Sequence, residues 1–306
     1  MILVAGLSPA WQQIMRFDAL RIGEVNRAAE FHWCASGKVI NVALALGRLG
    51  ASVEVLSTIG GAPGEAIRSE VTATGVTGHW IATAAATRVC TTLLDGGPGR
   101  VTELVENTAA ATPEELADFQ QLYERLVHHA ELVVLTGSLP AGSPATFYRD
   151  LLRLTNCPAI LDFRGPELWT ALERAPLLIK PNREELARTV GRELTNEHDV
   201  LSAVEELHGR GAQWVAITDG ARPMLVSGPG ERFRFVPPSI EVVNPIGSGD
   251  CLAAGTAWGI ITGLGMREAL QLGVAAAAEN VSQLLPAQLD PQAVRRRAAK
   301  VRVEFL

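Results

Sequence analysis

A glycine-rich loop near the end of the chain carries the clearest chemical signal in this sequence. The segment Asn244-Pro-Ile-Gly-Ser-Gly-Asp250 runs directly into an apolar segment that reads as a helix. Backbone N–H groups of Gly247, Ser248 and Gly249 at a helix N-terminus can hold an anion, because they have no partner within the helix. The Asp250 carboxylate could then accept a hydroxyl proton, which suits phosphoryl transfer. The other interpretation is an ordinary glycine turn in which Asp250 caps the helix. In either case the helix dipole should favour the ionised form of Asp250.

The segment Lys180-Pro-Asn-Arg-Glu-Glu185 supplies a second set of polar groups, directly after the strand predicted at residues 177–179. Asn182 is suited to be a helix N-cap, and Glu185, three residues later, completes a capping box. The same two side chains could instead hold Mg²⁺ and its waters near a nucleotide, because Mg²⁺ keeps several waters and few protein ligands. The sequence leaves both interpretations open.

Two further glycine-bearing segments could contribute to an anion site. Thr136-Gly-Ser-Leu-Pro-Ala-Gly142 follows the strand predicted at residues 132–136, and ligands bind at the carboxyl ends of strands in open α/β sheets. Ala35-Ser-Gly-Lys-Val-Ile-Asn41 places Lys38 and Asn41 around the start of a helix. Lys38 is then either a solvated charge or the basic group of an anion site.

Short apolar runs alternate with helix-period segments along the chain, and this alternation predicts a mainly parallel sheet with helices on both faces. The strand candidates are residues 2–7, 53–59, 132–136, 159–162, 177–179 and 214–218. The helix candidates are residues 39–49, 64–74, 113–128, 144–154, 183–189, 199–208, 249–263, 266–285 and 291–301. We therefore expect the four polar segments to lie at strand ends and helix starts of one α/β domain, which would position their side chains.

Two outlying segments break this alternation. Residues 14–33 and 88–106 read as strands, the second with a glycine-rich turn at 96–99. The simplest assembly is one small sheet made from both segments. A sheet of this size is only marginally stable alone, so it usually covers another part of the protein. Arg27 and Arg88 lie in these segments. They are surface charges by default and become relevant only if the sheet folds over a pocket.

The composition narrows the class of protein. The 306 residues carry a net charge of −6, which disfavours a protein that wraps nucleic acid. No uninterrupted apolar run reaches about 20 residues, so we expect no membrane span. The apolar start of the chain lacks a basic region and reads as a first strand. Four cysteines without metal-ligand spacing predict free thiols in a reducing cytoplasm: Cys34, Cys90, Cys157 and Cys251.

Taken in their order along the chain, these segments resemble the ribokinase/PfkB family of sugar kinases, in particular its 1-phosphofructokinase and tagatose-6-phosphate kinase branch. The resemblance extends over essentially the whole chain and includes Thr87-Arg88, Thr102-Glu103-Leu104 and the Gly-Ser-Leu-Pro and Lys-Pro-Asn-x-x-Glu segments. It implies one chain, 1–306, with a three-layer ribokinase-like α/β domain, a mainly parallel central sheet and a small β-sheet lid. The lid would be formed from about residues 12–34 and 87–107.

The resemblance also implies roles for individual residues. MgATP would be the donor, Asp250 the catalytic base, and Gly247, Ser248 and Gly249 the anion hole. ATP would be bordered by Lys180, Asn182, Thr218, Asp219, Gly220, Gly247, Gly249, Ala277 and Asn280. Magnesium would be held by Asn182 and Glu185, largely through water. The sugar phosphate would face Gln12, Arg27, Gly37, Lys38, Asn41, Arg88, Ser138 and Asp250, and a homodimer would form through the lid.

Three positions depart from the family pattern. Gln12 stands where the family has a sugar-binding carboxylate, and an amide can donate as well as accept a hydrogen bond. Val39 replaces a glycine and would add bulk where the sugar approaches. Pro223 replaces a glycine in the loop after the strand at 214–218. The first two departures affect the expected substrate more than the chemistry.

The sequence therefore predicts ATP-dependent phosphorylation of a hydroxyl on a ketose monophosphate, giving a bisphosphate. Two alternatives stay open. One is a kinase for a non-phosphorylated sugar or a nucleoside. The other is a non-catalytic protein that binds a sugar phosphate as a regulator, which the altered Gln12 and Val39 would allow.

Overall fold

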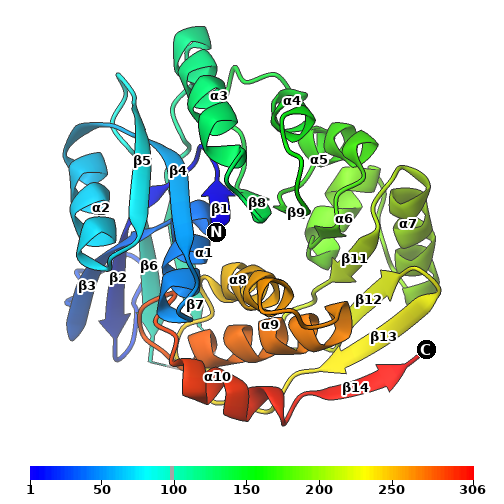
Figure 1. Cartoon of the computed structure of the whole chain (residues 1–306). Helices are drawn as coiled ribbons and strands as arrows, with labels where there is room; N and C mark the ends of the chain where they lie inside the picture. The colour runs from blue at the N-terminus through cyan, green and yellow to red at the C-terminus, as the bar shows by residue number, and fades with distance from the viewer. Residues whose placement is uncertain (97–99) are drawn as a thin grey trace.

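The computed structural model describes residues 1–96 and 100–306, and the chain forms one large and one small sheet (Figure 1). Residues 97–99 of the predicted turn lie outside the described residues. The large sheet has ten strands, in the order β14 (Arg302–Phe305), β13 (Glu231–Val236), β12 (Met224–Gly228), β11 (Trp214–Ile217), β10 (Leu178–Ile179), β9 (Ala159–Asp162), β8 (Leu132–Thr136), β1 (Ile2–Ala5), β4 (Val53–Ile59) and β5 (Thr77–Ala82).

The seven strands from β11 to β5 are parallel to their neighbours, and β12, β13 and β14 extend the sheet as antiparallel strands. β1 lies near the middle, where Val4 is paired with Val55 of β4 and with Val134 of β8. Because neighbouring strands are parallel, the carboxyl ends of β1, β8, β9, β10 and β11 meet at one edge. That edge collects the loops that the sequence singled out.

Alternate residues of the strands face two separate cores, as expected for a sheet covered on both sides. Ile2 and Val4 pack with one helical layer, whereas Leu3 and Ala5 pack with the other. The first layer consists of α1 (Lys38–Arg48), α2 (Gly61–Ala73), α8 (Ser248–Ile261), α9 (Met266–Val281) and α10 (Pro291–Ala298). The second consists of α3 (Pro113–Val127), α4 (Phe147–Arg153), α5 (Pro166–Ala171), α6 (Arg183–Val190) and α7 (Glu197–Gly209). The predicted three-layer α/β architecture is confirmed.

Sequence patterns missed the outermost strands of the large sheet. β5 and β14 are edge strands whose side chains are mostly exposed or half-buried, so neither shows a clean apolar alternation. β12 and β13 form a hairpin that the alternation of strands and helices did not suggest. The helix predicted at residues 144–154 begins only at Phe147, after a turn in which Phe147 N–H donates to Pro144 O.

The small sheet predicted from the two outlying segments is present, with four strands in the order β3 (Glu30–Ser36), β2 (Ala10–Phe17), β6 (Val89–Asp95) and β7 (Val101–Val105). Each predicted segment is a pair of strands, because residues 18–29 form a loop between β2 and β3. Ile14, Cys34 and Leu94 on one face pack against Leu284 and Leu285. That contact places the sheet beside the segment after α9, where Leu284 O accepts a hydrogen bond from Asn244 Nδ2 of the loop that leads into α8.

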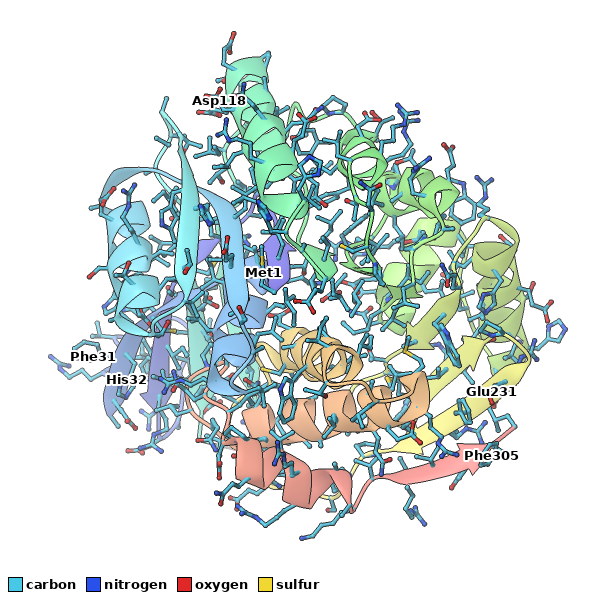
Figure 2. The ribbon with its side chains drawn as sticks, in the orientation of Figure 1. Met1, Phe31, His32, Asp118, Glu231 and Phe305 are labelled. Carbon is cyan, nitrogen blue, oxygen red and sulfur yellow. The ribbon has the colours of Figure 1, made fainter. Side chains whose placement is uncertain are left out.

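The other face of the small sheet is apolar and exposed. Trp11 and Trp33 stack on it, with ring centroids 6.0 Å apart. Phe31 and Leu104 are 62% and 55% exposed, and Phe31 lies at the outer edge of the molecule in Figure 2. No helix among the described residues is long and apolar enough to cross a membrane.

Candidate phosphoryl-transfer site

The N-terminus of α8 is built as an anion site. Gly247 is its N-cap with φ 78°, a left-handed conformation that glycine adopts without strain, and no side chain caps the helix. A Cβ on Gly247 would lie 3.0 Å from Pro286 Cβ and 3.3 Å from Asn41 Nδ2. A Cβ on Gly249 would lie 3.3 Å from Lys180 Nζ, so an ammonium group lies next to the first turn. The ammonium group of Lys180 therefore adds a positive charge next to the backbone N–H groups of this turn.

Asp250 lies in that first turn and is buried. Its Oδ2 accepts a hydrogen bond from Asn41 Nδ2 of α1 over 2.8 Å. Burial, followed by the nearby charge of Asp162, raises the pKa of Asp250 to about 6, against the opposing effect of Lys38. The expectation that the helix dipole would favour the ionised form is therefore wrong in its net direction, because desolvation outweighs it.

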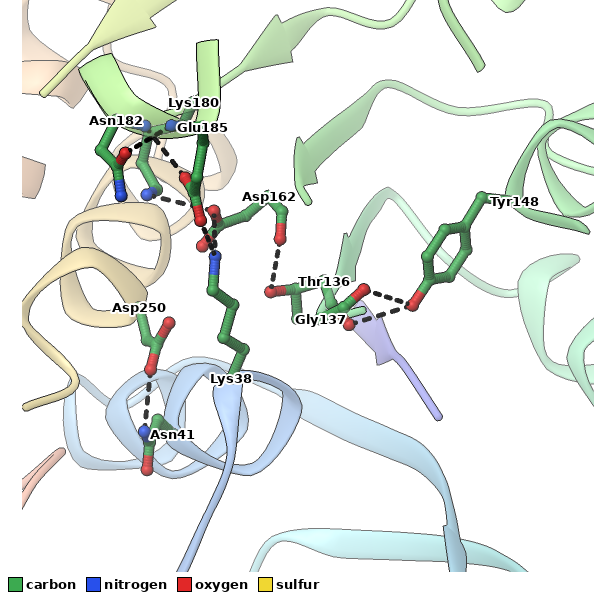
Figure 3. Close-up of polar contacts among 10 residues, drawn as sticks. All are labelled: Lys38, Asn41, Thr136, Gly137, Tyr148, Asp162, Lys180, Asn182, Glu185 and Asp250. Atoms are coloured by element: carbon green, nitrogen blue, oxygen red, sulfur yellow. Dashed lines mark hydrogen bonds and ion pairs between the residues drawn. The ribbon is translucent and has the colours of Figure 1, made fainter. Parts of the chain in front are cut away.

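Asp162 connects two lysines beside Asp250 (Figure 3). Its Oδ1 lies 3.0 Å from Lys38 Nζ and 3.2 Å from Lys180 Nζ, while its Oδ2 is buried without a hydrogen-bond partner. Burial would raise the pKa of Asp162, but Lys180 and Lys38 together hold it below its usual range. Conversely, burial would lower the pKa of Lys38, and the neighbouring carboxylates, Asp162 first, raise it above its usual range. The cluster therefore keeps its ion pairs at neutral pH.

Glu185 joins the same cluster from α6. Its Oε1 lies 3.3 Å from Lys38 Nζ, and its Oε2 accepts a hydrogen bond from Asn182 N–H over 3.0 Å. Asn182 Oδ1 in turn accepts from Glu185 N–H over 2.8 Å, which completes a capping box. The capping interpretation of this segment is thus confirmed, and the same carboxylate also faces the cluster.

Sequence reasoning missed Asp162. It is the last residue of β9 and is fully buried at the carboxyl edge of the sheet. The available signal was a carboxylate at the end of an otherwise apolar strand, which is followed along the chain by the strand that precedes Lys180. A buried carboxylate is rare unless paired, so this position could have been added to the candidates.

Comparison with known proteins identifies the family of this chain. Residues 10–292 match the model of the pfkB family carbohydrate kinases. The chain belongs to the pfkB family of carbohydrate kinases. A possible 1-phosphofructokinase of Thermotoga maritima is similar over 100% of this chain and 99% of its own, with 20% identity and a TM-score of 0.92. Phosphofructokinase-2 of Escherichia coli in complex with fructose-6-phosphate is similar over 98% of both chains, with 24% identity and a TM-score of 0.87. This chain is accordingly a phosphotransferase with an alcohol group as acceptor.

In this PfkB kinase the residues predicted to border ATP fall into two groups. Thr218 forms an isolated parallel bridge with Asn182, so the loop at 218–220 lies beside the start of α6. Asn280, by contrast, is fully buried: its Nδ2 donates to Ile246 O, and its Oδ1 accepts from Ala287 N–H. Asn280 therefore supports the loop before α8 from within the protein interior. Ala277, one turn earlier on α9, is half-buried, and Asp219 pairs with Arg222.

The residues predicted to face the sugar are also spread over different surroundings. Gln12 is a buried residue of β2 in the small sheet, and its Nε2 donates to Thr92 Oγ1 of β6 over 2.8 Å. Arg88 donates to three backbone carbonyls, those of Ser8, Pro9 and Glu106. Arg27 is exposed on the loop between β2 and β3. Of the three expected basic groups, Lys38 is paired with carboxylates, Arg88 is bonded to backbone carbonyls, and Arg27 is exposed to solvent.

Three more positions that the sequence related to the sugar have clear local roles. Gly37 is the N-cap of α1 with φ 87°, and a Cβ there would lie 2.9 Å from backbone atoms of Pro9 and Ala10. Ser138 is exposed, and its carbonyl accepts from Ser8 Oγ. Val39 is buried and packs in the hydrophobic core.

The donor set of the cluster fits the magnesium ion that the family implies. Among the described residues no three acidic, histidine or cysteine side chains form a preformed metal centre. Mg²⁺ needs none, because it keeps several waters and commonly takes one or two carboxylates plus substrate phosphates. The unpartnered Oδ2 of Asp162 and the carboxylate of Glu185 are hard oxygen donors of the required kind. Asn182 fits less directly, since its carbonyl oxygen already accepts from Glu185 N–H.

Proposed function

We propose that this kinase transfers the γ-phosphoryl group of MgATP to a hydroxyl of a ketose monophosphate and so forms a bisphosphate. The observation that carries the proposal is the pairing of a buried Asp250 carboxylate with the uncapped first turn of α8. A general base works best when its pKa lies near the working pH, and burial moves the pKa of Asp250 towards it.

In this proposal, different residues act on the attacking hydroxyl and on the transferring phosphoryl group. Asp250 accepts the proton of the attacking hydroxyl, and the hydrogen bond from Asn41 orients its carboxylate. In this proposal the N–H groups of the first turn of α8 bind the transferring group, and Lys180 beside Gly249 adds positive charge. Asp162 acts through Lys180 and Lys38, because its ion pairs fix where both ammonium groups lie.

Magnesium would be held by Asp162 and Glu185, with Asn182 at the same edge, largely through water. When bound, the ion supplies charge neutralisation for the nucleotide phosphates. Glu185 also orders the start of α6 through the capping box, so its removal should affect both the helix and the metal.

The phosphorylated acceptor is supported by the resemblance to phosphofructokinases, one of which was solved with fructose-6-phosphate. A non-phosphorylated sugar is the second candidate, and a specific observation favours it. Lys38 is neutralised by two carboxylates, and Arg88 is bonded to backbone carbonyls. Recognition of a second phosphate would require at least one of these cations to change partner.

We further propose that the small sheet acts as a lid and joins two copies of the chain. Its exposed apolar face, which includes Phe31, Trp33 and Leu104, is the kind of surface that a second copy covers. Light scattering should give the mass of a dimer for the unmodified chain and of a monomer for Phe31→Glu. A Phe305→Glu control, at an exposed residue of the large sheet, should stay dimeric.

The decisive experiment measures ADP formation from MgATP with ketose phosphates, free sugars and nucleosides. We expect turnover with a ketose phosphate and a loss of about 10²-fold or more in Asp250→Asn. Asp150→Asn, which alters a surface ion pair with Arg149, is the matched control and should keep its activity. Turnover only with free sugars would move the assignment to the second candidate. ATP and sugar-phosphate binding without turnover would indicate a regulator.

A further inference from the structure

A cavity of about 330 Å³ lies next to the phosphoryl-transfer cluster, at the carboxyl ends of β8 and β9. Its walls come from the loops after these two strands and from α4, α5 and α6. Lys38, Asp162 and Asp250 are not among its lining residues, whereas Ser138, which the sequence predicted to face the sugar phosphate, lies at its border. Small-molecule sites occupy roughly 300–1,000 Å³, so the cavity has room for a small metabolite.

Part of the cavity wall is rigid and apolar. Phe163 stacks on Tyr148 with ring centroids 4.2 Å apart, and both side chains are buried. The Tyr148 hydroxyl donates to the carbonyls of Thr136 and Gly137, which holds the loop after β8 in place. Leu139 of that loop adds a further apolar surface. Such a wall can cover the carbon skeleton of an organic ligand without rearrangement.

The charged part of the lining is mainly positive. Arg164 and Arg188 both line the cavity, with Glu167 as its acidic residue. Arg188 pairs with Glu184 on its own helix, whereas Arg164 makes no ion pair within residues 1–96 and 100–306. A guanidinium group is well shaped for two hydrogen bonds to a phosphate or carboxylate, so an oxyanion is the expected partner of Arg164.

The cavity walls are bonded to the backbone of the catalytic cluster. Gly137 N–H donates to Asp162 O over 3.1 Å. On the other side, Gly165 N–H donates to Thr189 Oγ1, which donates to Glu185 O. The side chains of Asp162 and Glu185 pair with the same lysine. A ligand that shifts the loops at 137–139 or 163–165 therefore acts on the positions of both carboxylates.

We propose that this cavity is a second ligand site, separate from the phosphoryl-transfer site. It binds a small organic molecule whose oxyanion group, a phosphate ester or a carboxylate, is held by Arg164 and Arg188. The carbon skeleton of the ligand covers Phe163 and Leu139. Occupancy changes turnover through the backbone bonds to Asp162 and Glu185.

The test is calorimetric binding of glycerol 3-phosphate, citrate and inorganic phosphate to the full chain without ATP or sugar. We expect glycerol 3-phosphate or citrate to bind, and Arg164→Gln to weaken that binding about tenfold or more through loss of a charge-assisted pair. Arg174→Gln, at an exposed arginine outside the cavity, is the matched control and should bind as the unmodified chain does. Preference between the two organic ligands identifies the phosphate or the carboxylate class.

Three results would overturn the proposal. The first is absence of binding by all three probes at about 10 mM, well above typical metabolite constants. The second is unchanged binding in the Arg164→Gln, Arg188→Gln double variant. The third is full displacement of the probe by the sugar substrate, which would make the cavity part of the acceptor site. Binding in Asp250→Asn should match that of the unmodified chain, so this test does not depend on whether Asp250 is the base.

Discussion

Asn41 Nδ2 and Asp250 Oδ2 lie 2.8 Å apart and join the first turn of α8 to α1 across 209 residues of sequence. The bond is buried, and Ser36 Oγ donates to the other side of the Asn41 amide, at Oδ1. Because the amide group donates to the carboxylate, it favours the ionised form of Asp250. Burial and the charge of Asp162 raise the pKa of the proposed base, whereas the charge of Lys38 and then this hydrogen bond lower it.

Loss of the amide in Asn41→Ala should move the acidic limb of the pH–rate profile upward. In the unmodified enzyme the rate should fall as pH drops through about 6, because Asp250 becomes protonated. Without the donor the pKa rises, by about one unit for a bond to a charged group, so the loss of rate begins at higher pH. The check is kcat/KM between pH 5 and 9. Ser36→Ala, which keeps the bond to Asp250, should shift the limb less, and equal shifts would contradict the role of Asn41.

Asp250→Asn should make the protein more stable at pH 8 while it abolishes activity. The folded-state pKa of about 6 exceeds the usual carboxyl value, so the native state binds a proton that the unfolded chain has released. The stability contribution of this group is greatest in acid and is lost as pH rises through about 6. An amide cannot ionise, and the gain at pH 8 should be up to about 3 kcal/mol. Urea unfolding at pH 5 and 8 measures it, and a variant less stable than the unmodified chain at pH 8 would contradict it.

Asp162→Asn should destabilise the fold because it leaves Lys180, which is buried, without its carboxylate. Breaking a buried ion pair from one side costs about 3–5 kcal/mol. The pKa of Asp162 is lowered, so its stabilising contribution exists at neutral pH and is lost as pH falls through that lowered value. Urea unfolding at pH 7 is the measurement. Asp150→Asn in a surface pair should cost about 1 kcal/mol or less, and a similar loss in both variants would argue against a special role for the cluster.

Gly37→Ala should cost several times more stability than Gly75→Ala. Both residues have φ above 80°, where a side chain costs about 1–2 kcal/mol, and ψ 148° places Gly37 near a region that is essentially restricted to glycine. They differ in surroundings: a Cβ on Gly37 would meet backbone atoms at 2.9 Å, whereas Gly75 faces open space. Thermal unfolding of the two variants measures the combined cost of the backbone conformation of Gly37 and of the close contact with the chain at Pro9. Equal changes in Tm would contradict it.

Much of the architecture was predictable because it depends on local patterns. Apolar runs with strand lengths alternate with helix-period segments, which predicts the parallel sheet and its two helical layers. The loop ending at Asp250 and the capping box of Asn182 and Glu185 are local too, since both depend on residues a few positions apart. Edge strands such as β14 were missed because exposed side chains leave no alternation to read.

By itself the sequence determined the α/β class, the order of the glycine-bearing loops and the carboxylate at the start of α8. Only the tertiary structure decided the state of that carboxylate and its neighbours. Asp162 contacts Lys38, which lies 124 residues away in the sequence. Lys38, which was expected to bind a phosphate, is therefore part of an ion pair. The pKa of Asp250 likewise depends on burial and on charges supplied by other strands. Burial and long-range charge contacts arise only when distant segments pack together, so no local pattern encodes them.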